Sequence, residues 1–388
     1  MHPDEFMATA PGRLVVAPEG HLAYVPDPLP PDLVLGRSTI NLMAEAERGL
    51  GELKGVGRRL PNPHLLINPF LRREAVLSSR IEGTTAGLQQ LLLFETAPSD
   101  AADQLDVLEV ANYVAALELG FLLLETIPVS LRLLRQVHAR LMEGVRGQEQ
   151  RPGEFRQVPN LIGHRGSTPE TARFVPPPVR EMQQVLHALE RYFGARRDDL
   201  PLLIQLALVH YQFETIHPFM DGNGRVGRLL IALQLRKRDY LPQPLLYLSA
   251  YFERHRDAYR DLLLGVSRSG DWIAWIDFFL RGIAEQAADT AQRSYQLMDL
   301  RESYQKWALA TSRSGNLAKL IDLLFLQPIV SISNVEAWLE VTQPAASRLI
   351  QQLVDAHVLV EVTGRQRNRR FAASPIMQII DAENGTGR

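Results

Sequence analysis

The sequence contains no cysteine. A chain without thiols forms no disulfide, uses no thiol nucleophile and binds no metal through thiolates. It also lacks an uncharged apolar run of about 18 residues, the length that a membrane-spanning helix needs. The N-terminus has no basic region followed by an apolar core, so we expect no secretory signal peptide. These absences predict a cytoplasmic protein that does not cross a membrane.

A strong net charge is missing as well. The 388 residues carry 42 Lys and Arg against 44 Asp and Glu, which gives a net charge of −2. This balance argues against nucleic-acid or membrane binding over the whole surface, although a local basic patch is possible. Hydrophobic residues make up 46% and charged residues 22%, which is ordinary for a globular protein. The length suits two or three domains.

The most informative stretch runs from His217 to Arg228 and reads HPFMDGNGRVGR. Residues 202–216 before it are apolar nearly all round, which predicts a buried helix. Residues 225–238 after it have helical apolar spacing, so the glycine-rich loop precedes the N-terminus of a second helix. Backbone N–H groups and the helix dipole bind anions at such a position. The stretch therefore predicts a phosphate site between two helices.

Two side chains in this stretch suit chemistry at a phosphate. His217 can take a proton from an attacking hydroxyl, because the ordinary histidine pKa suits a base at neutral pH. Asp221 can hold a Mg²⁺ ion that bridges phosphates, since hard cations prefer oxygen ligands. A metallohydrolase using His210, His217 and Asp221 is an alternative. Pro218 and the glycines disfavour it, because they interrupt helical i,i+4 spacing and no further strong ligand is near.

The glycine core and the two arginines complete the predicted site. Gly222 and Gly224, on either side of Asn223, let main-chain N–H groups approach a phosphate closely. Arg225 and Arg228 are three residues apart on one helix face, so both guanidiniums can contact the same polyphosphate. Each feature alone is more typical of a turn or a solvated helix face. Their joint occurrence at a buried helix end favours a phosphate site.

The rest of the chain reads as mostly helical. Residues 1–35 are rich in proline and predict an extended arm. The ranges with helical spacing are 36–60, 68–93, 103–124, 130–142, 179–197, 249–266 and 272–292. Residues 144–178 are polar and rich in turns, with a short hairpin expected from 155–161 and 172–175. Residues 304–315 look like a polar linker.

The C-terminal region has a different pattern. Residues 316–328, 333–339 and 343–356 predict three helices, and 358–362 and 369–372 predict two strands. This order is typical of a winged-helix module. We therefore predict an all-α core with a small β-hairpin flap and a C-terminal winged-helix domain. The expected divisions are an N-terminal arm and helical region at 1–110, a catalytic core at 111–300 and the winged helix at 315–380.

The motif from His217 to Arg228 resembles the signature of the Fic family at every specified position: His, Pro, Phe, an acid, Gly-Asn-Gly-Arg, and an Arg three further on. The resemblance covers roughly residues 30–285, and the tail is similar to that of a multi-domain subgroup. It implies Mg²⁺-dependent transfer of AMP from ATP to a Ser, Thr or Tyr hydroxyl of a target protein or of the enzyme itself, with release of pyrophosphate, and a homodimer.

The same resemblance implies a role for each residue of the motif. His217 would be the base on the target hydroxyl and Asp221 the Mg²⁺ ligand. The backbone of residues 222–224 would form an anion hole, while Arg225 and Arg228 would hold the β- and γ-phosphates. Family members that act as kinases replace the second loop glycine with lysine. Gly224 therefore favours an AMP transferase.

Residues 78–83, SSRIEG, resemble the inhibitory helix motif of the family. The resemblance implies that Glu82 pairs with Arg228 and keeps the γ-phosphate of ATP from its binding site. Ser78 and Gly83 are the other defining positions of the motif, and Gly83 is also a plausible C-cap. An exposed glutamate at a helix end is the plain alternative. In the matching subgroup the same glutamate also supports removal of AMP, so a reverse reaction is possible.

Residues 158–165, VPNLIGHR, resemble the flap of the family. Its open edge would hold the target by strand addition. Ile162 would pin the target side chain, and the base would be reached over Gly163. Tyr259 resembles a position that lines the adenine pocket, although a core aromatic is nearly as plausible.

A DNA-binding regulator with a Fic-like nucleotide sensor is the rival interpretation. Basic residues slightly outnumber acids between residues 313 and 373, and four arginines fall in the wing at 365–370. Such a cluster can meet a phosphate backbone. Ser347 and Arg348 would be the base-reading positions, but Ala345 and Ala346 make a poor recognition surface. The intact motif favours an enzyme.

Overall fold

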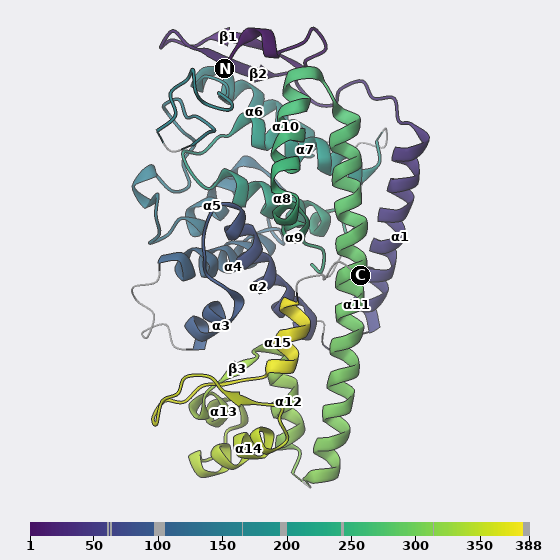
Figure 1. Cartoon of the computed structure of the whole chain (residues 1–388), viewed down its shortest axis with the longest axis vertical. Helices are drawn as coiled ribbons and strands as arrows, with labels where there is room; N and C mark the ends of the chain where they lie inside the picture. Colours follow the sequence, from purple (N-terminus) through teal and green to yellow (C-terminus); the bar gives the residue numbers. More distant parts are fainter. Residues whose placement is uncertain are drawn as a thin grey trace.

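The computed structural model describes residues 1–59, 62, 64–96, 105–164, 166–194, 200–241, 244–312 and 314–382. Most of this part of the chain is α-helical (Figure 1). The named strands form a two-stranded and a three-stranded sheet. The predicted fold class, a helical core followed by a winged-helix domain, is confirmed.

The core is built around one buried helix. Its helices are α1 (Arg37–Arg59), α2 (His64–Ile81), α3 (Leu88–Thr96), α4 (Leu105–Leu123), α5 (Leu131–Leu141), α6 (Val179–Gly194), α7 (Leu202–Ile216), α8 (Asn223–Lys237), α9 (Ser249–Arg254), α10 (Arg256–Ser269) and α11 (Trp272–Thr311). Nearly every residue of α7 is buried, as its apolar sequence predicts. It packs against α6, α8, α10 and α11, so the loop that follows it has a fixed position.

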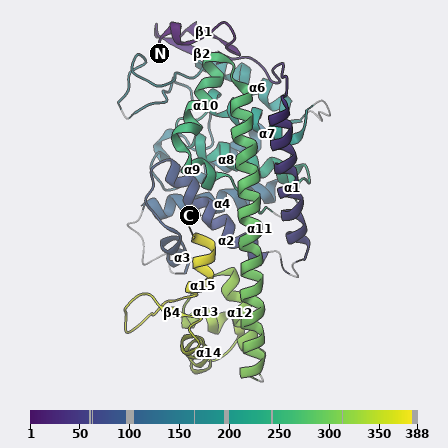
Figure 2. The same ribbon diagram turned by 45° about the vertical axis from the view of Figure 1, so that its right-hand side comes forward.

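Helix α11 runs along both parts of the molecule, and α1 lies beside its first half (Figures 1 and 2). The prediction of a polar linker at 304–315 is wrong, because the helix continues to Thr311. Two of its polar side chains bind α12 (Asn316–Leu326). Arg301 Nε lies 2.7 Å from Asp322 Oδ1, and Gln305 donates to the same carboxylate. Polarity here marks a helix–helix contact.

The N-terminal segment also differs from the prediction of an extended arm. It forms an antiparallel hairpin of β1 (Gly12–Val16) and β2 (Leu22–Pro26). Gly20, at φ +88°, provides the left-handed residue in the turn. The Tyr24 N–H donates to the Val175 carbonyl at 3.0 Å. The hairpin therefore covers the end of the polar segment that precedes α6.

Two predicted helices are each divided. The range 68–93 consists of α2, which begins earlier and contains Pro69, and α3. Gly83 has φ +102°, which fits its predicted place at a helix end. The range 249–266 is interrupted at His255, where φ is −110° and ψ 35°. Helix α5 begins as predicted, because Ser130 Oγ accepts from the Leu133 N–H. Some predicted ends, at positions 60, 103, 165 and 197, lie outside the described residues.

The predicted hairpin between 155–161 and 172–175 is wrong in its register. The strands meet at a single bridge, in which Ile162 and Phe174 exchange both backbone hydrogen bonds at 3.0 Å. Residues 155–160 do not pair with 172–175 and instead lie against the end of α7, where the Arg156 N–H donates to the Pro218 carbonyl at 2.9 Å. The flap is therefore a loop closed by one bridge.

The C-terminal domain contains α12, β3 (Ile329–Val330), α13 (Ile332–Leu339), α14 (Gln343–Asp355), β4 (Val360–Glu361), β5 (Phe371–Ala372) and α15 (Ser374–Asp381). Its sheet has the order β3-β5-β4 and is antiparallel. The sequence predicted three helices and two strands, and missed β3 and α15. Both α12 and α15 pack against α2 (Figure 2). None of the described helices is long and apolar enough to span a membrane.

Candidate active site

His217 ends the buried helix α7 in a strained conformation. It is the C-cap residue, with φ 49° and ψ 61° in the left-handed region that few non-glycine residues adopt. Its Nδ1 lies 3.1 Å from the Glu214 carbonyl, so Nδ1 carries the proton and Nε2 is the acceptor. Burial lowers the pKa of His217 to about 4. The imidazole is therefore a neutral base at physiological pH.

The loop after His217 is held by its own side chains. Asn223 Oδ1 accepts from the Phe219 N–H and its Nδ2 donates to the Phe219 carbonyl, both at 2.8 Å. The Gly222 N–H donates to Asp221 Oδ1 at 2.6 Å, and Gly222 has φ +75°. Helix α8 begins directly after this glycine, so unpaired N–H groups of its first turn point out of the helix end. N–H groups in this arrangement can bind an anion.

Arg228 and Glu82 form an ion pair next to this loop. Arg228 Nη2 lies 2.8 Å from Glu82 Oε1, while its guanidinium also donates to the Ser78 side chain and carbonyl at 2.8 and 2.9 Å. Only 2% of the Arg228 side chain is exposed, against 37% for Glu82. Burial by itself would raise the pKa of Glu82, but Arg228 outweighs it and the pKa is lowered. The carboxylate is therefore ionised and bound.

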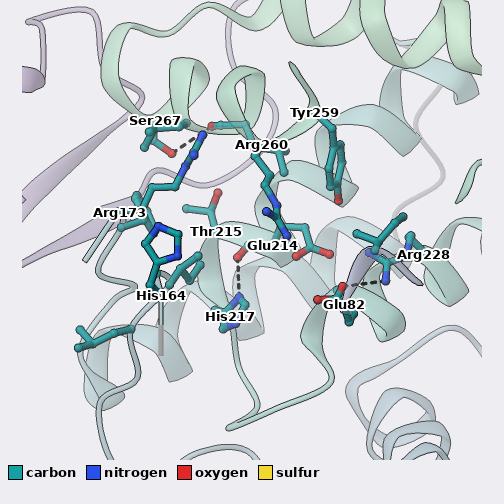
Figure 3. Close-up of a pocket in the computed structure, with 18 of the residues that line it drawn as sticks. Glu82, His164, Arg173, Glu214, Thr215, His217, Arg228, Tyr259, Arg260 and Ser267 are labelled. Atoms are coloured by element: carbon teal, nitrogen blue, oxygen red, sulfur yellow. Dashed lines mark hydrogen bonds and ion pairs between the residues drawn. The ribbon is translucent and has the colours of Figure 1, made fainter. Parts of the chain in front are cut away.

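These groups face one cavity of about 570 Å³. Figure 3 shows Glu82 and Arg228 on one side of it and His217 beneath Glu214. Of the predicted site residues, the cavity is lined by Glu82, Ile162, Gly163, His217, Gly224, Arg228 and Tyr259. A Cβ on Gly224 would lie 2.2 Å from Glu82 Oε1, so only glycine leaves room for this ion pair. The structure thus brings the loop, the flap and α2 together.

Asp221 and Arg225 lie beside the loop but do not line this cavity. Arg225 Nη1 is 3.7 Å from Glu109 Oε2, and its Nη2 is 3.8 Å from Asp221 Oδ1. Arg225 and Arg228 therefore have different partners. Arg225 Nε is buried and has no hydrogen-bond partner among the described residues. About half of the Asp221 side chain, 51%, is exposed.

Tyr259 and His210 pair in the wall of the site. The Tyr259 hydroxyl lies 2.8 Å from His210 Nε2, and the tyrosine ring stacks on Phe252. His210 Nδ1 lies 3.2 Å from the Gly227 carbonyl, so both of its ring nitrogens are engaged. His210 does not line the cavity. The described residues contain no group of three or more His, Asp or Glu that could hold a metal.

The sequence did not single out several polar residues of the cavity. Glu214 is the most unusual, because burial raises the pKa of its carboxyl to about 8, and its Oε1 has no partner among the described residues. Arg260 reaches into the cavity from α10 in Figure 3. His164, Arg173, Thr215 and Ser267 also line it. Of these residues, only Glu214 could have been found from the sequence, because it lies one helical turn before His217.

His138 was also missed, although it supports the loop. Its ring stacks on Phe219 with centroids 3.8 Å apart. Its Nδ1 accepts from the Gly153 N–H at 2.8 Å, so its Nε2–H donates to the Asp221 carbonyl at 3.1 Å. Burial lowers the pKa of His138 to about 4. This histidine is neutral and positions the loop without facing the cavity.

A buried helix, a glycine loop at the N-terminus of the next helix and a neutral histidine between them define a helical domain with a candidate anion site. Comparison with known families gives this class a name. Residues 40–122 match the Fic/DOC family N-terminal domain and residues 128–235 match the Fic/DOC family domain. The chain belongs to the Fic/DOC family. Residues 317–372 match an HTH DNA binding domain.

Curated relatives match over part of their length. A protein named Protein adenylyltransferase Fic from Culex quinquefasciatus is 30% identical over 158 residues, which is 40% of this chain and 27% of that protein. The protein of the same name from Drosophila erecta is 30% identical over 121 residues, covering 31% of this chain and 22% of the relative. The chain thus spans about a quarter of these relatives.

Solved structures support the fold. A Fic family protein from Desulfovibrio desulfuricans G20 aligns with a TM-score of 0.54 and 20% identity, covering 93% of this chain and 100% of the other. Fic-1 from C. elegans aligns with a TM-score of 0.51 and 19% identity, covering 67% of this chain and 74% of that one. At these identities the likeness concerns the fold alone.

Proposed function

We propose that this protein transfers AMP from ATP to a Ser, Thr or Tyr hydroxyl of a target protein, and that Glu82 restrains the reaction. The observation that carries the proposal is the neutral His217, whose free Nε2 faces a cavity bounded by the glycine loop and Arg228. The names of the curated relatives, Protein adenylyltransferase Fic, support the same activity. We also propose that the chain divides into an N-terminal helical region at 1–110, a catalytic core at 111–300 and the winged helix at 315–380.

In the proposed reaction, the target hydroxyl oxygen attacks the α-phosphorus of ATP. The bond from this phosphorus to the bridging oxygen breaks, and pyrophosphate leaves. The proton of the hydroxyl moves to His217 Nε2, while Nδ1–H stays bound to the Glu214 carbonyl and keeps the ring in place. Main-chain N–H groups of residues 222–224 at the start of α8 stabilise charge on the phosphate oxygens.

Mg²⁺ has a suitable ligand in Asp221. Its carboxylate is half-exposed beside the loop and is fixed through Oδ1 by the Gly222 N–H, so Oδ2 remains available for a cation. Protein sites for Mg²⁺ commonly use one or two carboxylates together with substrate phosphates. The ion would neutralise phosphate charge there. Arg225, whose Nε has no hydrogen-bond partner among the described residues, and Arg228 would hold the β- and γ-phosphates.

Glu82 occupies the guanidinium that the terminal phosphates need. The ion pair with Glu82 neutralises the charge of Arg228 and occupies an N–H group of its Nη2, so neither is available to a phosphate. Ser78 adds two further acceptors from α2, and Gly83 ends the helix in a left-handed turn. ATP must therefore break the pair before it binds productively. We also propose that Glu82 supports removal of AMP in the reverse direction.

The flap and Tyr259 complete the proposed binding site. Ile162 and Gly163 line the cavity from the flap, where a target segment would add as a strand over the base. Tyr259 lines the cavity with its ring and would contact the adenine. We also propose that the protein forms a homodimer and is located in the cytoplasm.

Labelled ATP tests the proposal directly. We expect label from α-³²P-ATP, and none from γ-³²P-ATP, to appear on protein in the presence of Mg²⁺. Glu82→Gly should label itself strongly, the wild type weakly and His217→Ala not at all. Label from the γ position would mean a kinase. Absence of label from all three proteins, with ATP binding intact, would refute the transferase.

A second function, DNA binding, is favoured by the wing. Its arginines at 365, 367 and 369 are exposed on the loop between β4 and β5, within the segment that matches an HTH DNA binding domain. Arginines on such a loop can neutralise phosphates. Binding to duplex DNA of arbitrary sequence should weaken steeply as salt is raised, and replacement of the three arginines by glutamine should reduce that dependence. Binding that does not change with salt would reject it.

A further inference from the structure

Arg156 lies at the root of the flap and is almost completely buried, with 2% of the residue exposed. Burial lowers the pKa of its guanidinium to about 10, so it keeps its charge at neutral pH. No carboxylate pairs with it among the described residues, and its guanidinium donates to backbone carbonyls there. Burial of a cation without a carboxylate partner costs free energy, so we expect Arg156 to have a role that offsets this cost.

The carbonyls belong to two parts of the site, the flap and the end of α7, whose relative position matters for the proposed reaction. Nη1 donates to Val158 at 3.3 Å and Nη2 donates to Pro177, and these two residues flank the flap. Nε donates to His217 at 3.0 Å, and Nη2 is 3.5 Å from the carbonyl of Ile216, the last residue of α7. The end of α7 carries partial negative charge from unpaired carbonyls, which stabilises a cation there.

The contact also explains how the strained histidine is held. His217 lies in the left-handed region immediately before Pro218. Such a conformation is strained and persists where the surrounding structure over-determines it. The His217 carbonyl accepts from Arg156 and, at 3.3 Å, from Asn160 Nδ2, which also donates to the Phe219 carbonyl at 2.9 Å. Two side chains of one short segment thus fix the backbone on both sides of Pro218.

We propose that Arg156, assisted by Asn160, is a positioning residue that fixes the flap and the base His217 relative to one another. The inference rests on the proposed function, since it assigns the flap to the target and His217 to its hydroxyl. Each nitrogen of the planar guanidinium has its own acceptor, and the single ammonium of lysine cannot reproduce this geometry. Arg156 does not line the cavity, so ATP does not touch it.

Arg156→Lys in the Glu82→Gly protein is the test, with three measurements. We expect the dissociation constant of ATP to change by less than about threefold, because the phosphate site is untouched. The kcat for AMP transfer should fall by about 10- to 100-fold, as expected for a small misplacement of reacting groups. Backbone amides of Ile162 and Phe174, which form the flap bridge, should exchange with deuterium at least about tenfold faster, since the flap loses its anchor.

Arg293→Lys is the matched control. Arg293 is also buried and donates to the backbone carbonyls of Ile379 and Ala382, far from the flap, and unlike Arg156 it also pairs with Asp289, at 2.8 Å. This control should lose stability without loss of kcat in the folded protein. If Arg156→Lys fails to fold, Asn160→Ala replaces it, with a smaller fall in kcat expected.

Unchanged kcat and unchanged flap exchange in folded Arg156→Lys, or in Asn160→Ala where it takes its place, would overturn the inference. Failure of the proposed function is a separate outcome. In that case the Glu82→Gly parent transfers no AMP although Arg156 is intact. Amide exchange at Ile162 and Phe174 then decides the positioning role without any activity.

Discussion

Replacement of Glu82 by glutamine should destabilise the free protein and make ATP a better stabiliser. The change keeps the size of the side chain and removes its charge. Arg228, 2% exposed, then keeps only neutral acceptors, which are the two oxygens of Ser78 and the new amide oxygen. Removal of one partner of a fully buried ion pair costs about 3–5 kcal/mol, whereas exposed pairs contribute about 0–1 kcal/mol.

The position of Glu82 lies between these limits. Because 37% of its side chain is exposed, water replaces part of the lost interaction. We therefore expect a loss of about 1–2 kcal/mol in the free energy of unfolding. For a domain of 150–250 residues, each kcal/mol lowers Tm by about 2–4 °C, so the melting temperature should fall by roughly 2–8 °C.

ATP supplies the anion that the variant lacks. A ligand present at 100 times its Kd adds about 2.7 kcal/mol to the stability of the folded state, so tighter binding appears as a larger rise in Tm. Thermal unfolding followed with and without ATP and Mg²⁺ is the assay. The rise in Tm should be larger for Glu82→Gln than for the wild type, because ATP no longer has to displace the carboxylate.

The control is Glu95→Gln, which breaks a 2.7 Å ion pair with Arg72 of similar partial burial away from the phosphate loop. It should lower Tm without changing the rise that ATP produces. If Glu82→Gln melts with the wild type and gains no more from ATP, the ion pair does not restrain ATP binding and the reasoning is refuted.

Two further substitutions test the geometry of the same cavity. In Gly224→Ala, the new Cβ would lie 2.2 Å from Glu82 Oε1 and 3.0 Å from Arg228 Nη1, so both the ion pair and the approach of phosphate should suffer. Titration calorimetry of Glu82→Gly/Gly224→Ala should show ATP binding at least about tenfold weaker than Glu82→Gly alone; equal affinity would place the phosphates elsewhere. Glu214→Gln tests a pH effect: the folded pKa near 8 lies above the unfolded value near 4.5, so the folded state holds the proton longer. The wild type should therefore lose stability as pH rises from 4.5 to 8, by at most about 1.4 kcal/mol per pH unit, and the variant should lose less. Urea midpoints at pH 5.5 and 7.5 measure this, and parallel slopes in the two proteins would contradict it.

The sequence predicts local parts of the site well, because they depend on neighbouring residues. The glycine loop, the helix on either side and the histidine at the junction all fall within 202–238, where periodicity and glycine spacing carry the information. The pairing of Glu82 with Arg228 joins residues 146 positions apart. It followed from a family resemblance, not from spacing.

Polarity misled the prediction where polar side chains meet other parts of the chain. Residues 304–315 were read as a linker, although Gln305 binds Asp322 of α12 and α11 continues to Thr311. The N-terminal arm was read from its prolines, although the five residues on either side of the Gly20 turn form a register of paired strands. In both cases tertiary contacts decided the structure.

Arg156 and Glu214 show why the rest of the site could not be predicted from the sequence. An arginine in a polar segment predicts a solvated side chain, and the carbonyls that bury Arg156 come from its own segment and from residues about 20 and 60 positions away. Glu214 lies one turn before His217, a spacing that places it on the same side of α7, but its neutral form at pH 7 depends on burial by α8 and α10. Residue type and spacing identify the groups that can act, whereas burial determines their charge and the direction in which they point. A site of this kind is therefore predictable in its loop, and the residues that orient the loop become visible only when the distant carbonyls are placed around them.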